Sequence, residues 1–439
     1  MRNPDTPPPA ASRRRTIVAT TIGNGLEFFD FTVYGFLALV IGKLFFPTFT
    51  SYGQLLLTVA SFGVGFIMRP LGGIVIGAYA DRAGRKKAMT LTIFLMALGC
   101  ALIAFTPTYA AIGVAAPIVI VVARLIQGFS AGGEVGASTT LLVEHATPAN
   151  RGYMASWQFA SQGLGVLMGA VVVGGLTLAL TPEAMQDWGW RLPFVIGMLI
   201  APVGMYIRRH LEESLHVAPQ TAARAPRESS LKVVCTQHGR TVLAAILLLV
   251  GGTTAAYVVT FYMATYAVRE LGLAPSVALL GAGLTGLISF VLAPFVGRLS
   301  DVVGRKPLIL WSRIAMAIVI YPCFLWLNAS PTPAVLFTVL GLLSVGLVAQ
   351  TVPGITMLPE MFPKAVRASG MSLVYSVGVA LFGGFAPFIS TWLLNATGSK
   401  LAPAWYLVAM TVVSLLGLLW LRDHTGRDID AAGAHAPAR

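Results

Sequence analysis

The chain has 439 residues, of which 56% are hydrophobic and only 11% are charged, and its formal net charge is +13. Soluble domains contain about 25% charged residues, so a water-soluble globule of this length could not cover its surface with so few. The composition therefore excludes an aqueous enzyme, a nucleic-acid-binding domain and a disordered polymer as descriptions of the whole chain.

Twelve apolar stretches follow one another along the chain, each near the roughly 20 residues that a helix needs to cross a bilayer. They cover residues 17–42, 55–79, 88–106, 113–143, 152–178, 191–209, 241–267, 276–298, 308–327, 334–358, 368–394 and 403–421. The sequence therefore predicts an all-α membrane protein with twelve transmembrane helices.

Positive residues are unequally distributed between the two sides of these spans. Of the 30 Lys and Arg residues, 23 lie in the N-terminal tail and in every second polar segment after it, whereas 4 lie in the intervening loops. By the positive-inside rule this bias places both termini in the cytoplasm, for a multi-pass protein of a bacterial inner membrane. We attribute the net charge to topology, and expect the lipid bilayer but no nucleic acid as a partner.

A polar stretch divides the spans into two sets of six. We expect a cytoplasmic N-terminal tail, a first six-helix bundle, a cytoplasmic linker, a second six-helix bundle and a cytoplasmic C-terminal tail. These parts cover residues 1–16, 17–209, 210–240, 241–421 and 422–439.

An internal repeat supports this division. The segment GAYADRAGRKK follows the second span, and GRLSDVVGRKP follows the eighth. Five residues match at a constant offset of 220, so that Gly77, Asp81, Gly84, Arg85 and Lys86 correspond to Gly297, Asp301, Gly304, Arg305 and Lys306. Parallel repeats of this kind predict two pseudo-symmetric bundles with a binding site at their interface, near the bilayer midplane.

The recurring charged turns predict a gating motif, to which we assign the matched residues other than Gly297, together with Arg82. An Asp and an Arg–Lys pair in a tight turn can engage helix ends and nearby carboxylates, which would hold one orientation of the bundles. Alternatively, these residues only anchor helix ends at the membrane surface. A weaker echo follows the fourth and tenth spans, where Glu144 precedes Arg151, and Glu360 precedes Arg367, by seven residues.

The repeated turn and the twelve-span length resemble the major facilitator superfamily. Three further segments resemble its metabolite:proton symporter group, namely GNGLEFFDFTVYG from Gly23, MRPLGG from Met68 and RLIQGFSAGGE from Arg124. The resemblance implies the major facilitator fold and a transporter of citrate and tricarballylate, 2-oxoglutarate, shikimate, or proline and betaine.

Five ionisable residues lie within the spans of the first half, where each would cost about 2.5–3.5 kcal/mol without a partner, water or a function. They are Glu27, Asp30, Arg69, Arg124 and Glu134. We therefore expect them to face a shared polar cavity and to handle ions there. The second half has only Arg313, which lies close enough to the end of its span to extend its charge to the membrane surface.

Helical spacing places these residues on two polar faces. Asn24, Glu27, Asp30 and Tyr34 fit one face of the first span, and Arg124, Gln127 and Glu134 follow one stripe of the fourth. We expect Arg124 and Arg69 to bind a substrate anion, although either could instead form a structural ion pair with Glu27 or Asp30. Asn24, Tyr34 and Gln127 are further candidates for substrate binding on these faces.

The spans contain no histidine, so a titrating group in the pathway must be a carboxylate. Asp30, Glu27 and Glu134 are the candidates for proton coupling, with Asp30 preferred as the carrier because it lies deeper. A sodium site remains an alternative. Cys100, Cys235 and Cys323 are widely separated and predict no disulfide framework, and we expect no metal or cofactor.

The second bundle should supply mostly neutral contacts. Tyr257 and Gln350 are candidates there, and Gln158 and Gln162 are candidates in the fifth span. For each of these residues, packing or an interhelical hydrogen bond is an equally valid role.

These observations predict a monomeric, proton-coupled symporter that imports a small organic anion by alternating access, with citrate the leading substrate. The alternatives are 2-oxoglutarate or another dicarboxylate, shikimate, or a zwitterionic osmolyte. The tail from Arg422 is only 18 residues long and lacks heptads, which ranks the osmolyte lower. The spans contain no catalytic cluster, so we do not expect an enzyme.

Overall fold

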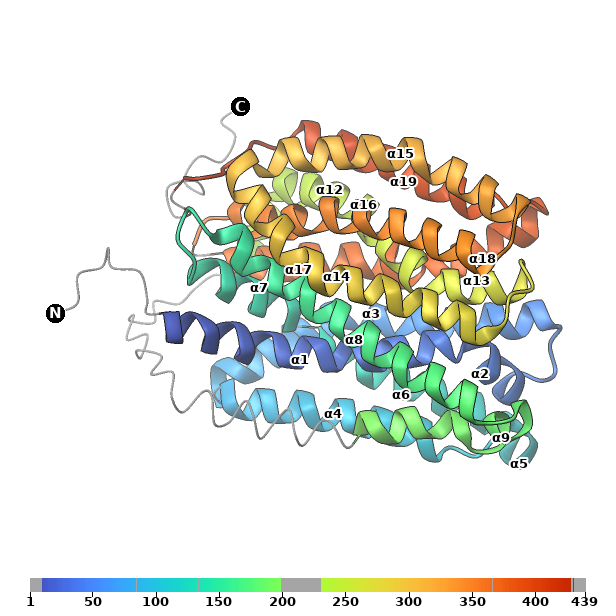
Figure 1. The fold of residues 1–439 in the computed structure, drawn as a ribbon. Helices are drawn as coiled ribbons and strands as arrows, with labels where there is room; N and C mark the ends of the chain where they lie inside the picture. Colours follow the sequence, from blue (N-terminus) through green and yellow to red (C-terminus); the bar gives the residue numbers. More distant parts are fainter. Residues whose placement is uncertain are drawn as a thin grey trace.

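The structure is a computed structural model that describes residues 10–83, 85–132, 134–198, 230–364, 366–427 and 429. The described elements are all helical and run nearly parallel in one elongated bundle (Figure 1). Within the described helices, the side chains of residues 10–16, 19–20, 22, 77–78, 80–83, 85–86, 88–89, 134, 137 and 230–232 also lie outside the description.

In its described part, the first half contains a helical segment at residues 192–198 and, before it, nine α-helices and a short 3-10 turn. They are α1 (Ala10–Phe36), α2 (Ala38–Phe45), α3 (Ser51–Ala83), α4 (Arg85–Phe105), α5 (Tyr109–Ile112), α6 (Ala115–Ala131), α7 (Glu134–Glu144), α8 (Arg151–Ala179), α9 (Pro182–Asp187) and the turn η1 (Gly189–Arg191).

The described part of the second half contains α-helices and two π-helical turns. They are α11 (Ser230–Gln237), α12 (Gly239–Tyr257), η2 (Val258–Tyr262), α13 (Met263–Arg269), α14 (Pro275–Val303), α15 (Arg305–Ala329), α16 (Pro333–Glu360), α17 (Arg367–Val379), η3 (Ala380–Gly384), α18 (Ala386–Thr397) and α19 (Ala402–Leu419).

The helices coincide with the predicted spans. Within the described residues, eight helices are long and apolar enough to cross a membrane, and residues 23–36 of α1 with α2 make a ninth if this bent pair is one span. The shorter apolar helices Thr90–Phe105 and Ala115–Ala131 fall on the predicted third and fourth spans. The predicted sixth span, 191–209, continues beyond residue 198, outside the described residues.

Three spans are interrupted where the apolar pattern gives no warning. The chain bends by 61° between α1 and α2, although no proline lies there. The seventh and eleventh spans each contain a π-helical turn, η2 and η3, at similar places in the second bundle. Such turns insert one extra residue, redirect the side chains that follow and frequently occur at functional sites.

Glycines let helices of the two halves approach closely. On α8, a Cβ at Gly163 would lie 2.7 Å from the backbone nitrogen of Phe290 on α14, and one at Gly286 would lie 2.7 Å from that of Leu167. At a second contact between the halves, a Cβ at Gly384 of η3 would lie 2.6 Å from the ring of Phe66 on α3. The halves therefore meet along α8–α14 and along α3–η3, as small residues permit in membrane bundles.

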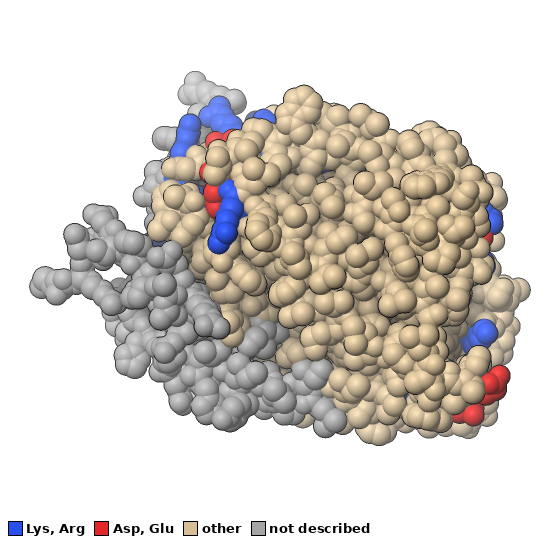
Figure 2. All heavy atoms as spheres, viewed as in Figure 1, with Lys and Arg blue, Asp and Glu red and all other residues tan. Residues whose placement is uncertain are grey.

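Charged side chains gather at the two ends of the bundle, mostly at the end where α1 begins and α19 ends, which we call the terminal end (Figure 2). The broad band between the ends shows almost no charged side chain on this face. In the described structure, large apolar side chains such as Phe295, Trp311 and Ile318 are more than half exposed. This band matches the lipid-facing surface that the composition predicts.

Candidate functional site

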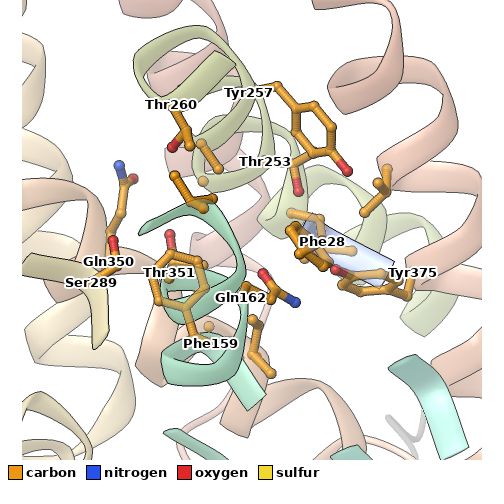
Figure 3. A pocket seen from close by; sticks show the side chains of 18 of the residues that line it. Phe28, Phe159, Gln162, Thr253, Tyr257, Thr260, Ser289, Gln350, Thr351 and Tyr375 are labelled. Carbon is orange, nitrogen blue, oxygen red and sulfur yellow. The ribbon is translucent and has the colours of Figure 1, made fainter. Parts of the chain in front are cut away.

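A cavity of about 50 Å³ lies between the two halves (Figure 3). Space of this measure accommodates several water molecules at roughly 10–15 Å³ each. Its wall contains neutral polar and aromatic side chains from α1 and α8 of the first half, and from α12, η2, α14, α16 and α17 of the second. The labelled residues are Phe28, Phe159, Gln162, Thr253, Tyr257, Thr260, Ser289, Gln350, Thr351 and Tyr375.

Three of the predicted binding residues lie on this wall, namely Gln162, Tyr257 and Gln350. Gln350 is fully buried, and neither end of its amide has a hydrogen-bond partner in the described part of the chain. A buried amide without a partner is costly, so it is well suited to bind a polar solute that enters the cavity.

The charged residues of the first half form two ion pairs. The Arg69 Nη2 atom donates to Glu27 Oε1 at 2.7 Å, and Arg124 Nη1 lies 3.6 Å from Asp30 Oδ2. All four residues are buried. We expected these charged residues to face one shared polar cavity, but they form two local ion pairs. Neither arginine lines the cavity in this conformation.

The Asp30 pair has two further neighbours. The thiol of Cys100 on α4 donates to Asp30 Oδ1 at 3.0 Å, and Arg124 Nη1 donates to Gln127 Oε1 at 2.7 Å. The Gln127 amide in turn donates to the Cys100 sulfur at 3.6 Å. Asp30 is therefore held by a longer ionic contact and a weak thiol donor, whereas Glu27 has a short charge-assisted hydrogen bond.

An aromatic layer covers both guanidinium groups. The Arg69 guanidinium lies 4.2 Å from the ring centre of Phe66, and that of Arg124 lies 4.5 Å from the ring of Tyr34. Phe66 also contacts Tyr257, with ring centres 5.3 Å apart. Because Tyr257 lines the cavity, the ring of Phe66 contacts both the Arg69 guanidinium and a residue of the candidate binding site.

The remaining predicted residues of the first and fifth spans hold helices together. The Asn24 amide donates to the Gln158 carbonyl oxygen at 3.0 Å and to Ser161 Oγ at 2.8 Å, which joins α1 to α8. Ser138 donates to Gln158 Oε1 at 3.0 Å, and the Tyr34 hydroxyl hydrogen-bonds Ser61. Asn24, Gln158 and Tyr34 lie outside the cavity wall in this conformation.

The second copy of the predicted gating motif lies at the terminal end, where it contacts the first half. Asp301 accepts hydrogen bonds from the backbone nitrogens of Gly152 at 2.7 Å and Tyr153 at 2.9 Å, at the start of α8. A carboxylate there meets the positive end of the helix dipole. Arg305 also pairs with Asp301 at 2.8 Å, and Gly304 has a φ of +105°, a conformation that favours glycine.

The side chains of the first copy lie outside the described residues, as does that of the proton-coupling candidate Glu134. The first-copy positions are Gly77, Asp81, Arg82, Gly84, Arg85 and Lys86.

The weaker sequence echo proves to be a pair of crossed ion pairs. Arg151 of the first half lies 2.8 Å from Glu360 of the second, and Arg367 of the second lies 3.0 Å from Glu144 of the first. Glu360 also lies 3.5 Å from Arg305. These contacts join the halves at the terminal end. In the sequence, the only signal of them was that each Glu precedes its Arg by seven residues.

The segment after α19 adds to this closure. Asp423 accepts from the Lys306 backbone nitrogen at 2.9 Å, and the Thr425 hydroxyl accepts from that of Arg305 at 3.0 Å. Burial alone would raise the pKa of Asp423, but hydrogen bonds from Thr425 and Lys306 hold it below its usual value. The Arg427 carbonyl oxygen accepts from Arg151 at 3.1 Å, so the segment reaches the first half.

Arg313 corrects the expectation that it extends to the membrane surface. Its side chain is only 1% exposed and lines the cavity. It donates to the carbonyl oxygens of Ser414 on α19, at 3.1 Å, and of Leu248 on α12. The prediction was wrong because α12 and α19 approach closely at Gly251, where a Cβ would lie 2.3 Å from Ser414 Oγ. The guanidinium thus finds acceptors inside the bundle.

Two related bundles of membrane-spanning helices around a cavity, with ionic contacts at one end, are typical of a membrane transporter. The chain matches the family model "Sugar (and other) transporter" over residues 16–232 and the model "Major Facilitator Superfamily" over residues 267–437. It belongs to the major facilitator superfamily, in its metabolite:proton symporter group.

Curated relatives cover nearly the whole chain. It is 38% identical to a "Citrate-proton symporter" of Salmonella typhi over 97% of this chain and 98% of the relative. It is 37% identical to the "Alpha-ketoglutarate permease" of Escherichia coli over 93% and 94%, respectively. It is 32% identical to the "Proline/betaine transporter" of Salmonella typhimurium over 95% and 85%. These relatives confirm the predicted class, a symporter rather than an enzyme.

Solved structures confirm the predicted fold. The D-xylose-proton symporter superposes with a TM-score of 0.73 at 18% identity, over 94% of this chain and 98% of its own. The human organic anion transporter MFSD10 gives a TM-score of 0.60 at 18% identity, over 94% and 100%.

Proposed function

We propose that the protein imports citrate together with protons by alternating access across the bacterial inner membrane. The observation that carries this proposal is the 38% identity to a citrate-proton symporter over almost the full length of both chains. The cavity between the halves supports it, because its largely apolar wall contains a few amides, hydroxyls and one guanidinium that can orient a polar solute.

A dicarboxylate such as 2-oxoglutarate is the second candidate. The identity to the alpha-ketoglutarate permease, 37%, is nearly the same as that to the citrate symporters. The proline and betaine relatives are less similar, at 31–32% identity. Citrate and 2-oxoglutarate both present carboxylates to the same donors, so competition between them is the direct comparison.

The ion pairs of the first half provide a route for proton coupling. A proton on Asp30 would release Arg124 from its carboxylate, which leaves the guanidinium available to the substrate. Arg124 Nε and Nη2 have no hydrogen-bond partner within the described residues, so donors are already available. Asp30 is the better carrier than Glu27 because its ionic contact is longer, 3.6 Å against 2.7 Å.

The terminal end is the natural candidate for the cytoplasmic gate. We place both termini and the linker in the cytoplasm, on the distribution of Lys and Arg in the sequence. The crossed ion pairs would then close the inner gate, and substrate would enter the cavity from outside. We further propose that one chain embedded in lipid forms the complete transporter.

Uptake by purified protein in liposomes tests the function. An inward proton gradient should accumulate labelled citrate, a sodium gradient alone should not, and unlabelled 2-oxoglutarate should compete more weakly than unlabelled citrate. Liposomes without protein are the control. If no di- or tricarboxylate is taken up, or if uptake ignores the proton gradient, the proposed function is wrong.

The cysteines test the orientation. Cys235 on α11 is exposed, whereas Cys100 and Cys323 are buried. A membrane-impermeant maleimide should therefore label Cys235 in inside-out vesicles but not in intact cells, and Cys235→Ser is the control. Labelling of Cys235 in intact cells would reverse the orientation.

A further inference from the structure

One buried arginine differs from all the others in the described structure. Six arginines have side chains that are almost completely buried, and five of them lie within 4.0 Å of a carboxylate. These five are Arg69, Arg124, Arg151, Arg305 and Arg367. Arg313 has no carboxylate partner among the described residues, although it lies at membrane depth. A buried charge without a counter-charge is expensive, so it calls for a function.

The contacts of Arg313 leave part of its hydrogen-bonding capacity unused. Its two terminal nitrogens donate to the carbonyl oxygens of Ser414 and Leu248, and its Nε has no partner in the part of the chain described. A guanidinium carries five N–H donors in a planar fork, of which two are used here. The remaining donors suit a carboxylate, which accepts two parallel hydrogen bonds.

The surroundings of Arg313 are electrically neutral. Glu27 compensates Arg69, and Asp30 compensates Arg124. No Asp or Glu is among the residues that line the cavity. The described wall therefore carries one uncompensated positive charge, contributed by the second half of the molecule.

We propose that Arg313 binds a carboxylate group of the substrate and is the charged recognition residue of the second half. This inference rests on the proposed transport of an organic anion and assigns that function a contact outside the first bundle. An anion in the cavity would supply the missing counter-charge. Gln350, which lines the same cavity and has an unpartnered amide, would contact a further polar group of the same ligand.

Substitution of Arg313 tests the proposal, with Arg191 as a matched control. Arg191 also donates to two backbone carbonyl oxygens, of Ala104 and Thr106, and has no carboxylate partner within the described residues, but it lies away from the cavity. Isothermal titration of purified protein gives the citrate Kd, and uptake in liposomes gives KM and kcat.

For Arg313→Gln we expect the citrate Kd and KM to rise about 10- to 100-fold, as for loss of a charged hydrogen bond. Arg313→Lys, which keeps the charge but not the fork, should show a rise of about 3- to 10-fold. Arg191→Gln should stay within about twofold of the wild type. A purely structural role of Arg313 would lower the amount of folded protein but leave the Kd of the folded fraction unchanged.

The outcomes of these measurements distinguish the proposed transport function from the proposed role of Arg313. Wild-type protein that binds neither citrate nor 2-oxoglutarate overturns the proposed function. Wild-type binding with an unchanged Kd and KM in Arg313→Gln overturns the role of Arg313 alone. Should Arg313→Gln fail to fold, Arg313→Lys decides, because unchanged affinity there contradicts the need for a bidentate contact.

Discussion

Within the membrane-spanning helices, away from the terminal end, the two halves of the molecule bury arginine in opposite ways. In the first half, Arg69 and Arg124 each have a carboxylate partner and are stacked on aromatic rings. In the second half, Arg313 has only two backbone carbonyl oxygens. At this depth the first half therefore pairs its cations with carboxylates, whereas the second half holds one cation without a counter-charge among the described residues.

This difference makes a strong prediction about stability. Arg124→Met leaves the buried Asp30 without its cation, so we expect the free energy of unfolding to fall by about 3–5 kcal/mol and uptake to be lost. Arg313→Met removes a charge that has no counter-charge, so stability should stay within about 1 kcal/mol of the wild type or rise. Thermal unfolding in detergent, without substrate, measures both. If Arg313→Met is as unstable as Arg124→Met, the contrast between the halves is wrong.

The two carboxylates of the first span should also differ. Asp30→Asn mimics the protonated carrier, so we expect citrate exchange to persist while accumulation driven by a proton gradient falls at least about 100-fold. Glu27→Gln should retain the dependence on the gradient, because its short bond to Arg69 is structural. Counterflow and gradient-driven uptake in the same liposomes distinguish these outcomes. If only Glu27→Gln lost the dependence on the gradient, Glu27 rather than Asp30 would be the proton carrier.

A third comparison concerns the two crossed ion pairs at the terminal end. Glu360 is fully buried between Arg151 and Arg305, whereas the Glu144 side chain is 36% exposed. Glu360→Gln should weaken the closed gate by about 2–5 kcal/mol, and Glu144→Gln by less than about 1 kcal/mol. Distances between spin labels on α7 and α16 report the open fraction. Equal opening in both variants would contradict the dominance of the Glu360 site.

The apolar pattern was sufficient to predict the spans because burial in lipid depends on composition over whole helices. It could not predict the bend after Phe36 or the π-helical turns, which depend on packing against neighbouring helices. The pattern also placed Glu27, Asp30, Arg69 and Arg124 together, but left their partners open. That Arg313 faces inward follows from the close approach of α12 and α19, two spans that are far apart in sequence.

The ion pairs at the terminal end could not be predicted from the sequence for a related reason. Arg151 contacts Glu360 of the other half, and Arg367 contacts Glu144 of the other half. These contacts therefore appear only when both halves are placed together. The equal spacing of Glu144–Arg151 and Glu360–Arg367 was a visible signal, but it indicated only the internal repeat and no contact between the halves. The structure turns it into the crossed arrangement that holds the halves in contact.

The smallest expected effect concerns the segment after α19 and its dependence on pH. Burial lowers the pKa of His424 below its usual value of 6.5, so the folded segment prefers the neutral imidazole. Its contribution is complete above pH 6.5 and decreases as the pH falls through the lower folded pKa, since the released segment binds the proton more readily. Hydrogen exchange of residues 421–427 should therefore accelerate severalfold between pH 7 and about pH 5, after correction for the intrinsic rate. His424→Phe should abolish this change, whereas Asp423→Asn should not, because the lowered pKa of Asp423 makes it titrate only below 3.8. An unchanged pH profile in His424→Phe would assign the sensitivity to another group at the gate.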